Sequence, residues 1–186
     1  MRVISGVLKG KKISIPIDNK TRPLRDLVKE SIFNLIIHSN KFNFELNNSN
    51  ILDLFSGTGS FGIECLSRNA KKVTFIENYN SVLKILKKNI ESLGIKDKTE
   101  IIEKDCFNFF KSKKKFDNKF NLVFIDPPYH EDKINLIINE IKERKVLDEK
   151  GIIIIHRHKN DNINISNKLK ILDERNYGIS KIIIGN

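Results

Sequence analysis

A run of apolar residues, 122–125, stops abruptly at the tetrapeptide Asp126-Pro127-Pro128-Tyr129. Both prolines fix their own φ angle and lack an N–H group, and Pro127 also holds Asp126 in an extended conformation. The turn therefore presents hydrogen-bond acceptors, the Asp126 carboxylate and the Pro127 carbonyl, and few donors. Such a corner suits an NH2 group and disfavours an anion.

An exocyclic amine of a nucleobase is a poor nucleophile, because its lone pair is delocalised into the ring. Two acceptors that bind its hydrogens favour a pyramidal nitrogen whose lone pair points at an electrophile. Positive charge grows on this nitrogen during methyl transfer, so fixed acceptors stabilise the transition state more than the ground state. Tyr129 offers a ring for base stacking, worth ~1–3 kcal/mol. We therefore predict that residues 126–129 hold an amine that is being methylated.

A second motif, ILDLFSGTGSFG at residues 51–62, joins a predicted strand to a predicted helix. Gly57 and Gly59 allow a tight turn and a close approach to a ligand, and with Gly62 they match the dinucleotide pattern G-x-G-x-x-G. The Lys-Ser/Thr pair of a P-loop is missing, which argues against ATP. Asp53 at the strand end favours the cationic groups of S-adenosylmethionine over the pyrophosphate of NAD.

Acidic residues also end the next two predicted strands. Glu77 can accept both ribose hydroxyls of either cofactor, and Asp105 can reach an adenine edge, cap the following helix, or do both. We predict that S-adenosylmethionine is the cofactor. Its candidate contacts are Asp53, Phe55, Gly57, Gly59, Glu77, Asp105 and Cys106.

From residue 50 onward, apolar strands alternate with amphipathic helices, which is typical of a largely parallel sheet covered on both faces. Strands are predicted over 51–55, 72–77, 100–105, 120–126 and 151–158, with strand-like segments at 168–175 and 179–185. Helices are predicted over 60–69, 81–94, 106–112 and 133–144. Ligands bind beyond the carboxyl ends of such strands, where both motifs fall.

Residues 1–45 follow a different pattern. Short alternating stretches around Lys9-Gly10 predict a small hairpin, and apolar residues at helical spacing from Leu24 to Ile36 predict a helix with Pro23 in its first turn. We therefore divide the chain into an N-terminal extension, 1–45, and a methyltransferase domain, 46–186; its basic residues make the extension the expected RNA-contacting part.

The charge of the 186-residue chain is +11, which suggests a polyanionic partner. Lysine is abundant throughout, so the position of the arginines is more informative: three of seven lie in the first 25 residues. Their planar forks suit phosphates. No stretch approaches the ~20 apolar residues of a membrane helix, no signal peptide is visible, and two cysteines suggest neither a disulfide framework nor zinc. We expect a cytoplasmic protein without a metal.

Together, four segments resemble the bacterial 16S ribosomal RNA guanine-N2 methyltransferase family of the RsmD type. They are RVISGVLKGKKISIP, TRPLRDLVKESIFNLI, LDLFSGTGSFGIECLSRNAKKVTFIE and FIDPPY. This resemblance implies an α/β, Rossmann-like, seven-stranded fold with a small N-terminal extension. It also implies methyl transfer to the N2 amine of a guanine in small-subunit RNA, within an assembled or assembling particle. We expect a monomer.

The resemblance also implies roles for individual residues. Asp126 to Tyr129 would hold the guanine, and the candidates for RNA phosphate contacts are Arg2, Lys9, Lys11, Arg22 and Arg25. The chain departs from the family at Leu8, where an aromatic residue is common, and at Arg25, where a small hydroxyl residue is common. His156-Arg157-His158 follows the fifth strand, where an acid is frequent. We expect both histidines to be surface positions, because displacement by an amine needs no strong base.

Other functions remain open from the sequence. Enzymes that methylate adenine N6 or cytosine N4, in RNA or DNA, can use the same turn, although those acting on DNA usually carry a target-recognition domain for which this chain has no room. A non-catalytic RNA-binding or assembly factor would not need the intact loop, acid and turn. An NAD-dependent oxidoreductase would need a proton donor and a substrate domain, and neither is visible.

Overall fold

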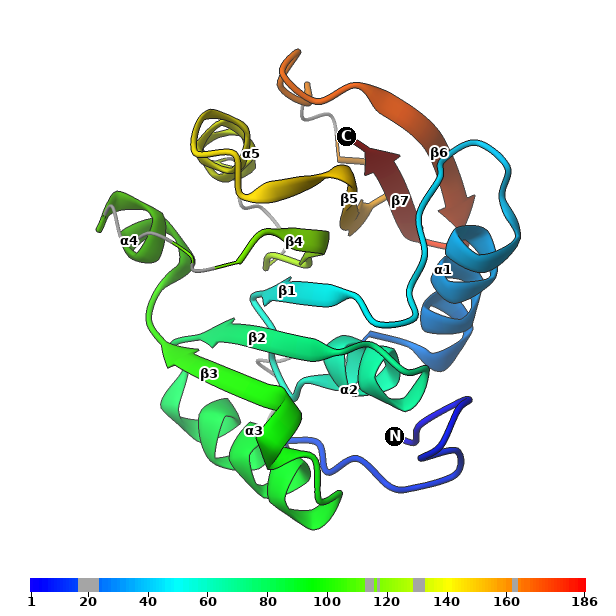
Figure 1. Ribbon diagram of the computed structural model, residues 1–186, viewed down its shortest axis with the longest axis vertical. Coiled ribbons are helices and arrows are strands. Elements are labelled where there is room, and N and C mark those ends of the chain that lie inside the picture. Colours follow the sequence, from blue (N-terminus) through cyan, green and yellow to red (C-terminus); the bar gives the residue numbers. More distant parts are fainter. Residues whose placement is uncertain (17–23, 113–115, 117, 129–132, 162–163) are drawn as a thin grey trace.

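The computed structural model describes residues 1–16, 24–112, 116, 118–128, 133–161 and 164–186. Its centre is one seven-stranded sheet with the strand order β3-β2-β1-β4-β5-β7-β6 (Figure 1). The strands are β1 Asn50–Leu54, β2 Lys72–Glu77, β3 Thr99–Glu103, β4 Phe120–Ile125, β5 Leu147–His158, β6 Ile171–Tyr177 and β7 Ser180–Gly185. Strands β1 to β5 run parallel, and β7 is antiparallel to both β5 and β6. The predicted seven-stranded α/β fold is confirmed.

Helices cover both faces of the sheet. They are α1 Asp26–His38, α2 Ser60–Ser67, α3 Asn80–Ser92, α4 Cys106–Lys111 and α5 Ile134–Glu143, with a 3-10 turn, η1, at Lys96–Lys98. Successive strand residues point to opposite faces, and this alternation divides the buried apolar side chains into two clusters. Residues of α1, α2 and α3 pack in one cluster, and residues of α4 and α5 pack in the other.

The strand order reverses at β1, which lies between β2 and β4. In register, Leu54 pairs with Ile76 on one side and with Ile125 on the other. The carboxyl ends of the three strands are therefore level, so that Glu77 and Asp126 lie at one edge of the sheet with the loop that follows β1. Sheets of this kind bind their ligands at such a reversal point.

The predicted hairpin is a compact loop with one isolated bridge, Arg2 to Lys12, rather than a pair of strands. Val3 N donates to Lys11 O, and the side chains of Val3 and Ile13 are buried in the same cluster as the sheet residue Phe75. The N-terminal segment thus shares the main hydrophobic core, and the division at residue 45 stays a prediction.

Two predicted boundaries shift. Helix α1 begins at Asp26 rather than near Pro23, which lies outside the described residues. Strand β5 begins at Leu147, four residues before the predicted start, because Leu147 pairs with Phe120 ahead of a bulge in the β4–β5 ladder. Within the part of the chain that the structure describes, no helix is long and apolar enough to cross a bilayer.

Candidate active site

The glycine loop connects β1 to α2 through left-handed backbone conformations. Gly57 has a φ of +55° and Gly59 a φ of +80°. A Cβ atom on Gly59 would lie 2.5 Å from Leu86 Cδ1, so another residue there would have to displace the Leu86 side chain as well as adopt a strained φ. Phe55 also has a positive φ, +57°, which is unusual for a bulky side chain. Its ring meets Phe107 of α4 edge-on, 5.9 Å between centroids.

Glu77 ties the end of β2 to the glycine loop. Its Oε2 accepts a hydrogen bond from Gly57 N at 2.8 Å, and its Oε1 accepts from Asn78 N and Tyr79 N at 2.8 and 2.9 Å. The carboxylate is half-buried, and each of its oxygens has more than one lone pair. The side chain can therefore hold the loop in place and still accept hydroxyl groups from a ligand.

Asp53 is the most buried carboxyl group at this edge, with 1% of its surface exposed. Its Oδ2 accepts from Gly62 N at 3.1 Å, in the first turn of α2. Burial raises the pKa of Asp53 well above its usual range; the Gly62 hydrogen bond opposes this shift, and the charges of Asp126 and Glu77 add to it. Three carboxyl groups thus act on one another electrostatically, an arrangement that favours a cationic ligand and opposes a pyrophosphate.

Asp105 and Cys106 lie where β3 leads into α4. Asp105 caps that helix, since its Oδ1 accepts from Asn108 N at 2.9 Å. Cys106 is buried, and burial raises the pKa of its thiol in spite of a hydrogen bond with the Phe55 backbone. The thiol is therefore uncharged at neutral pH and lies next to the Phe55 backbone. The role of Asp105 at an adenine edge stays a prediction.

The acceptor turn follows β4 directly. Asp126 N donates to Leu54 O at 3.5 Å, which joins the turn to the end of β1. The Asp126 side chain is 24% exposed, so the carboxylate is partly open to solvent rather than enclosed in the core. Pro127 is buried and Pro128 is exposed, and Tyr129 lies outside the described residues. The structure therefore brings Asp53, Glu77 and Asp126 to one edge, as the sequence predicts.

The expectation that His156 is a surface residue is wrong. Only 7% of its surface is exposed; its Nδ1 lies 2.8 Å from Asp126 Oδ1 and its Nε2 lies 2.9 Å from Ser180 Oγ. His156 pairs with Ile182 and lies two residues after Ile154, so it points to a covered face of the sheet. Extending the period of two from the isoleucines to His156 predicts this burial. His158 is half-buried.

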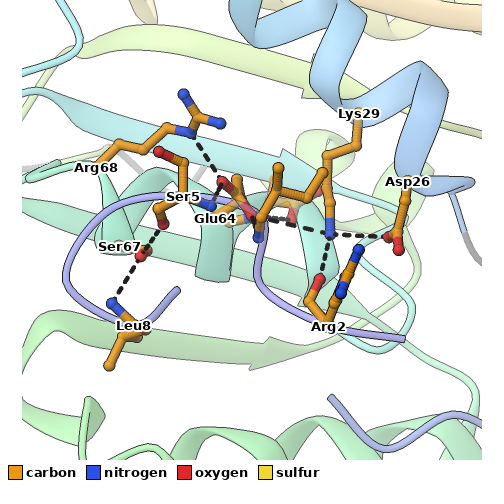
Figure 2. Close-up of polar contacts among 11 residues, drawn as sticks. Arg2, Ser5, Leu8, Asp26, Lys29, Glu64, Ser67 and Arg68 are labelled. Carbon is orange, nitrogen blue, oxygen red and sulfur yellow. Dashed lines mark hydrogen bonds and ion pairs between the residues drawn. The ribbon is translucent and has the colours of Figure 1, made fainter. Parts of the chain in front are cut away.

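Buried groups of α2 hold the backbone of residues 4–8 in place, close to Arg2 (Figure 2). Glu64 is fully buried and accepts from Ile4 N at 2.7 Å, from Ser5 N at 2.9 Å and from Arg68 Nε at 2.8 Å. Lys29 of α1 is also fully buried, with Nζ 3.9 Å from Glu64 Oε2. These contacts place the segment beside α2 (Figure 1).

Close backbone contact with Ser67 completes this attachment. Val7 N donates to Ser67 O at 2.8 Å, Leu8 N donates to Ser67 Oγ at 2.9 Å, and Ser67 Oγ donates to Ser5 O. A Cβ atom on Gly6 would lie 1.8 Å from Ser67 O, so this approach requires glycine. Four of the predicted phosphate contacts are exposed and the fifth, Arg22, lies outside the described residues; the four are Arg2, Lys9, Lys11 and Arg25.

Replacing Asp53 by asparagine is expected to weaken S-adenosylmethionine binding about 10–100-fold, the value of one charge-assisted hydrogen bond.

The same replacement should change how stability depends on pH. The folded protein holds the Asp53 proton more tightly than the unfolded chain does, so the stability of the wild type falls as pH rises from about 3.9 through the raised pKa. The variant lacks this loss and should unfold at a higher temperature than the wild type at pH 8, but not at pH 4. Calorimetry measures both quantities; unchanged cofactor affinity would contradict the assignment.

The family model described as Conserved hypothetical protein 95 matches residues 1–186. Ribosomal RNA small subunit methyltransferase D of Haemophilus influenzae is 32% identical over 180 residues, which cover 96% of this chain and 90% of that protein. The protein of the same name from Buchnera aphidicola is 34% identical over 161 residues, 87% of this chain and 80% of that protein.

Solved structures agree in fold. The Escherichia coli protein yhhF has a TM-score of 0.81 at 24% identity, with 100% of this chain and 96% of that chain covered. An RNA methyltransferase from Salinibacter ruber, in complex with S-adenosyl-L-homocysteine, has a TM-score of 0.63 at 15% identity, with 88% and 92% covered. Because the family model matches the whole chain, and the relatives bear out the resemblance to the RsmD type, this protein belongs to the family described as Conserved hypothetical protein 95.

Proposed function

We propose that this protein transfers the methyl group of S-adenosylmethionine to the exocyclic N2 amine of a guanine in 16S ribosomal RNA. One observation carries the proposal: an acceptor turn at Asp126 lies at the same sheet edge as a glycine loop and two further carboxyl groups, Asp53 and Glu77. The relatives named ribosomal RNA small subunit methyltransferase D support ribosomal RNA as the substrate.

The residues at the strand ends fit this cofactor. A buried carboxyl group with a raised pKa, Asp53, becomes a favourable partner when an ammonium group approaches it. Glu77 would accept the ribose hydroxyls, and Phe55, Asp105 and Cys106 would border the adenine. The left-handed turn at Gly57 and Gly59 lets the backbone come close to the methionine end.

Bound S-adenosylmethionine supplies a methyl group on a positively charged sulfur. The chain's own residues would position the nucleophile. The Asp126 carboxylate and the Pro127 carbonyl accept the two hydrogens of the guanine amine, which directs its lone pair at the methyl carbon. Methyl transfer would leave positive charge on the nitrogen next to the carboxylate, where fixed acceptors are most stabilising. The demethylated sulfur compound would be the leaving group, and the surplus proton of the methylated amine would pass to the Asp126 carboxylate or to solvent.

The exposed basic side chains on the N-terminal segment would bind RNA phosphates. Replacing Lys9, Lys11 and Lys12 together by glutamine should weaken RNA binding and flatten its salt dependence. If each lysine meets one phosphate, the slope of log K against log salt should fall by about two to three. Truncation is a poor substitute, because Val3 and Ile13 belong to the core.

A matched control removes the same charge elsewhere, at Lys111, Lys150 and Lys170, which are exposed on other parts of the surface. This control should bind RNA with nearly the wild-type slope. Filter binding across a salt series measures both variants. Equal slopes for the two triple variants would mean that the N-terminal lysines act only through net charge.

The defining experiment is transfer of a labelled methyl group to small ribosomal subunits from a strain that lacks the enzyme, followed by identification of the product nucleoside. N2-methylguanosine supports the proposal, whereas N6-methyladenosine supports the alternative amino-methyltransferase. Cofactor binding without transfer would indicate a non-catalytic factor. Comparing naked RNA with subunits tests the expected assembled or assembling substrate. That the protein works as a cytoplasmic monomer also stays a prediction.

A further inference from the structure

We propose that His156 and Ser180 are positioning residues that fix the orientation of the Asp126 carboxylate. This inference rests on the proposed role of Asp126 in methyl transfer. The three side chains form a continuous chain of hydrogen bonds: Asp126 Oδ1 to His156 Nδ1 at 2.8 Å, and His156 Nε2 to Ser180 Oγ at 2.9 Å.

The topology of the sheet creates this chain from three segments. Ile125 of β4 pairs with Ile155 of β5, so the next residues, Asp126 and His156, are neighbours across the parallel ladder. Ser180 begins β7, the antiparallel partner of β5, and reaches the imidazole from its other side. Both His156 and Ser180 are almost completely buried, with 7% and 5% exposed.

The chemistry of the three groups sets the direction of each hydrogen bond. An ionised carboxylate only accepts, so His156 Nδ1 carries a hydrogen and donates it to Asp126. In an imidazole with a hydrogen on Nδ1 alone, Nε2 is an acceptor to which the Ser180 hydroxyl can donate. Ser180 therefore stabilises the tautomer that serves Asp126.

The hydrogen bond from His156 determines which acceptors at Asp126 and Pro127 remain for the amine. The terminal torsion of an aspartate is broad, so an unrestrained carboxylate samples many orientations. The His156 hydrogen bond occupies Oδ1 and restricts that rotation, which leaves Oδ2 and the Pro127 carbonyl as a fixed pair for the amine. Misplacement of a reacting group by about 1 Å can cost ~10²-fold in rate.

Two isosteric replacements separate positioning from simple core packing. In His156→Asn the amide nitrogen takes approximately the place of Nδ1 and keeps a donor toward Asp126. In His156→Gln the amide takes approximately the place of Nε2, so the contact with Ser180 is kept and the donor toward Asp126 is lost. We expect His156→Asn to retain kcat within about 3-fold, and His156→Gln to lose about 10–100-fold.

The Michaelis constant for RNA and the affinity for S-adenosylmethionine should stay unchanged in both variants. Ser180→Ala should lower kcat by a smaller factor, because Nδ1 can still donate. Equal kcat losses in His156→Asn and His156→Gln, or losses that follow the unfolding temperature alone, would overturn the inference and leave His156 a structural residue.

A readout that does not depend on turnover distinguishes failure of this inference from failure of the proposed function. Nitrogen-15 chemical shifts of the full-length protein should show a hydrogen on Nδ1 of His156 near neutral pH, and this signal should change in Asp126→Ala. A wild type that shows the Nδ1–H form but methylates no ribosomal RNA contradicts the proposed function. A hydrogen found on Nε2 alone contradicts the inference, whatever the activity.

Discussion

Replacing Asp126 by alanine is expected to lower the rate of methyl transfer about 10²–10³-fold, the usual effect of removing a fixed group that stabilises developing charge. Affinity for S-adenosylmethionine should change little, because the proposed cofactor contacts lie on β1, on the glycine loop and at the ends of β2 and β3. Loss of the Asp126 charge also removes one cause of the raised pKa of Asp53, which favours the ionised form that binds a cation. Single-turnover kinetics and calorimetric titration measure the two quantities separately.

Asp126→Asn is the matched control for this experiment. Asparagine keeps an acceptor oxygen for the amine. His156 can adapt by moving its hydrogen to Nε2 and donating to Ser180, while its Nδ1 accepts from the new amide. The asparagine variant should therefore retain far more activity than alanine. If alanine reduces transfer and cofactor binding equally, Asp126 belongs to the cofactor site instead.

The order of strands and helices was predictable because its signals are local. Apolar runs such as 122–125 form central strands wherever neighbours cover both faces, and the left-handed glycines and the two prolines act on the backbone at their own positions. Once a parallel sheet is inferred, its carboxyl ends meet at one edge, so the grouping of Asp53, Glu77 and Asp126 follows without knowledge of side-chain contacts.

What the sequence did not reveal depends on contacts between distant segments. Asp126 and His156 are 30 residues apart in the sequence, and His156 and Ser180 are 24 residues apart. The hydrogen bonds that connect these three side chains form only because β4, β5 and β7 are neighbours in the sheet. The role of Glu64 also depends on a distant contact, since its hydrogen bond with Ile4 spans 60 residues. Its position in the otherwise apolar or small helix segment SFGIECLS was a usable signal, because a lone acid there must be buried with a partner.

Among the residues that hold the N-terminal segment in place, the fully buried Glu64 of α2 should lower the stability of the protein most when it is replaced. Glu64→Gln keeps the shape but removes the charge that compensates Lys29 and Arg68, and breaking one side of a buried pair costs about 3–5 kcal/mol of unfolding free energy. Denaturant titration measures this loss. Amide exchange at Ile4 and Ser5, which donate to the carboxylate, should accelerate more than exchange in the central strands. RNA affinity should fall, while S-adenosylmethionine affinity should hold in the folded fraction.

Two controls and a pH series identify the cause. Glu100→Gln removes an exposed partner of Lys72 and should cost less than about 1 kcal/mol, and Lys29→Met combined with Glu64→Gln should recover part of the loss. Burial lowers the pKa of Lys29, against the opposing charges of Glu64 and Asp26, so the unfolded chain holds that proton more tightly. Stability therefore rises with pH from the lowered pKa up to about 10.4. Without Glu64 that pKa drops further, so the deficit of Glu64→Gln should shrink between pH 7 and pH 10. A deficit that stays constant over this range would mean that lost hydrogen bonds to Ile4 and Ser5, rather than an uncompensated Lys29, cause the instability.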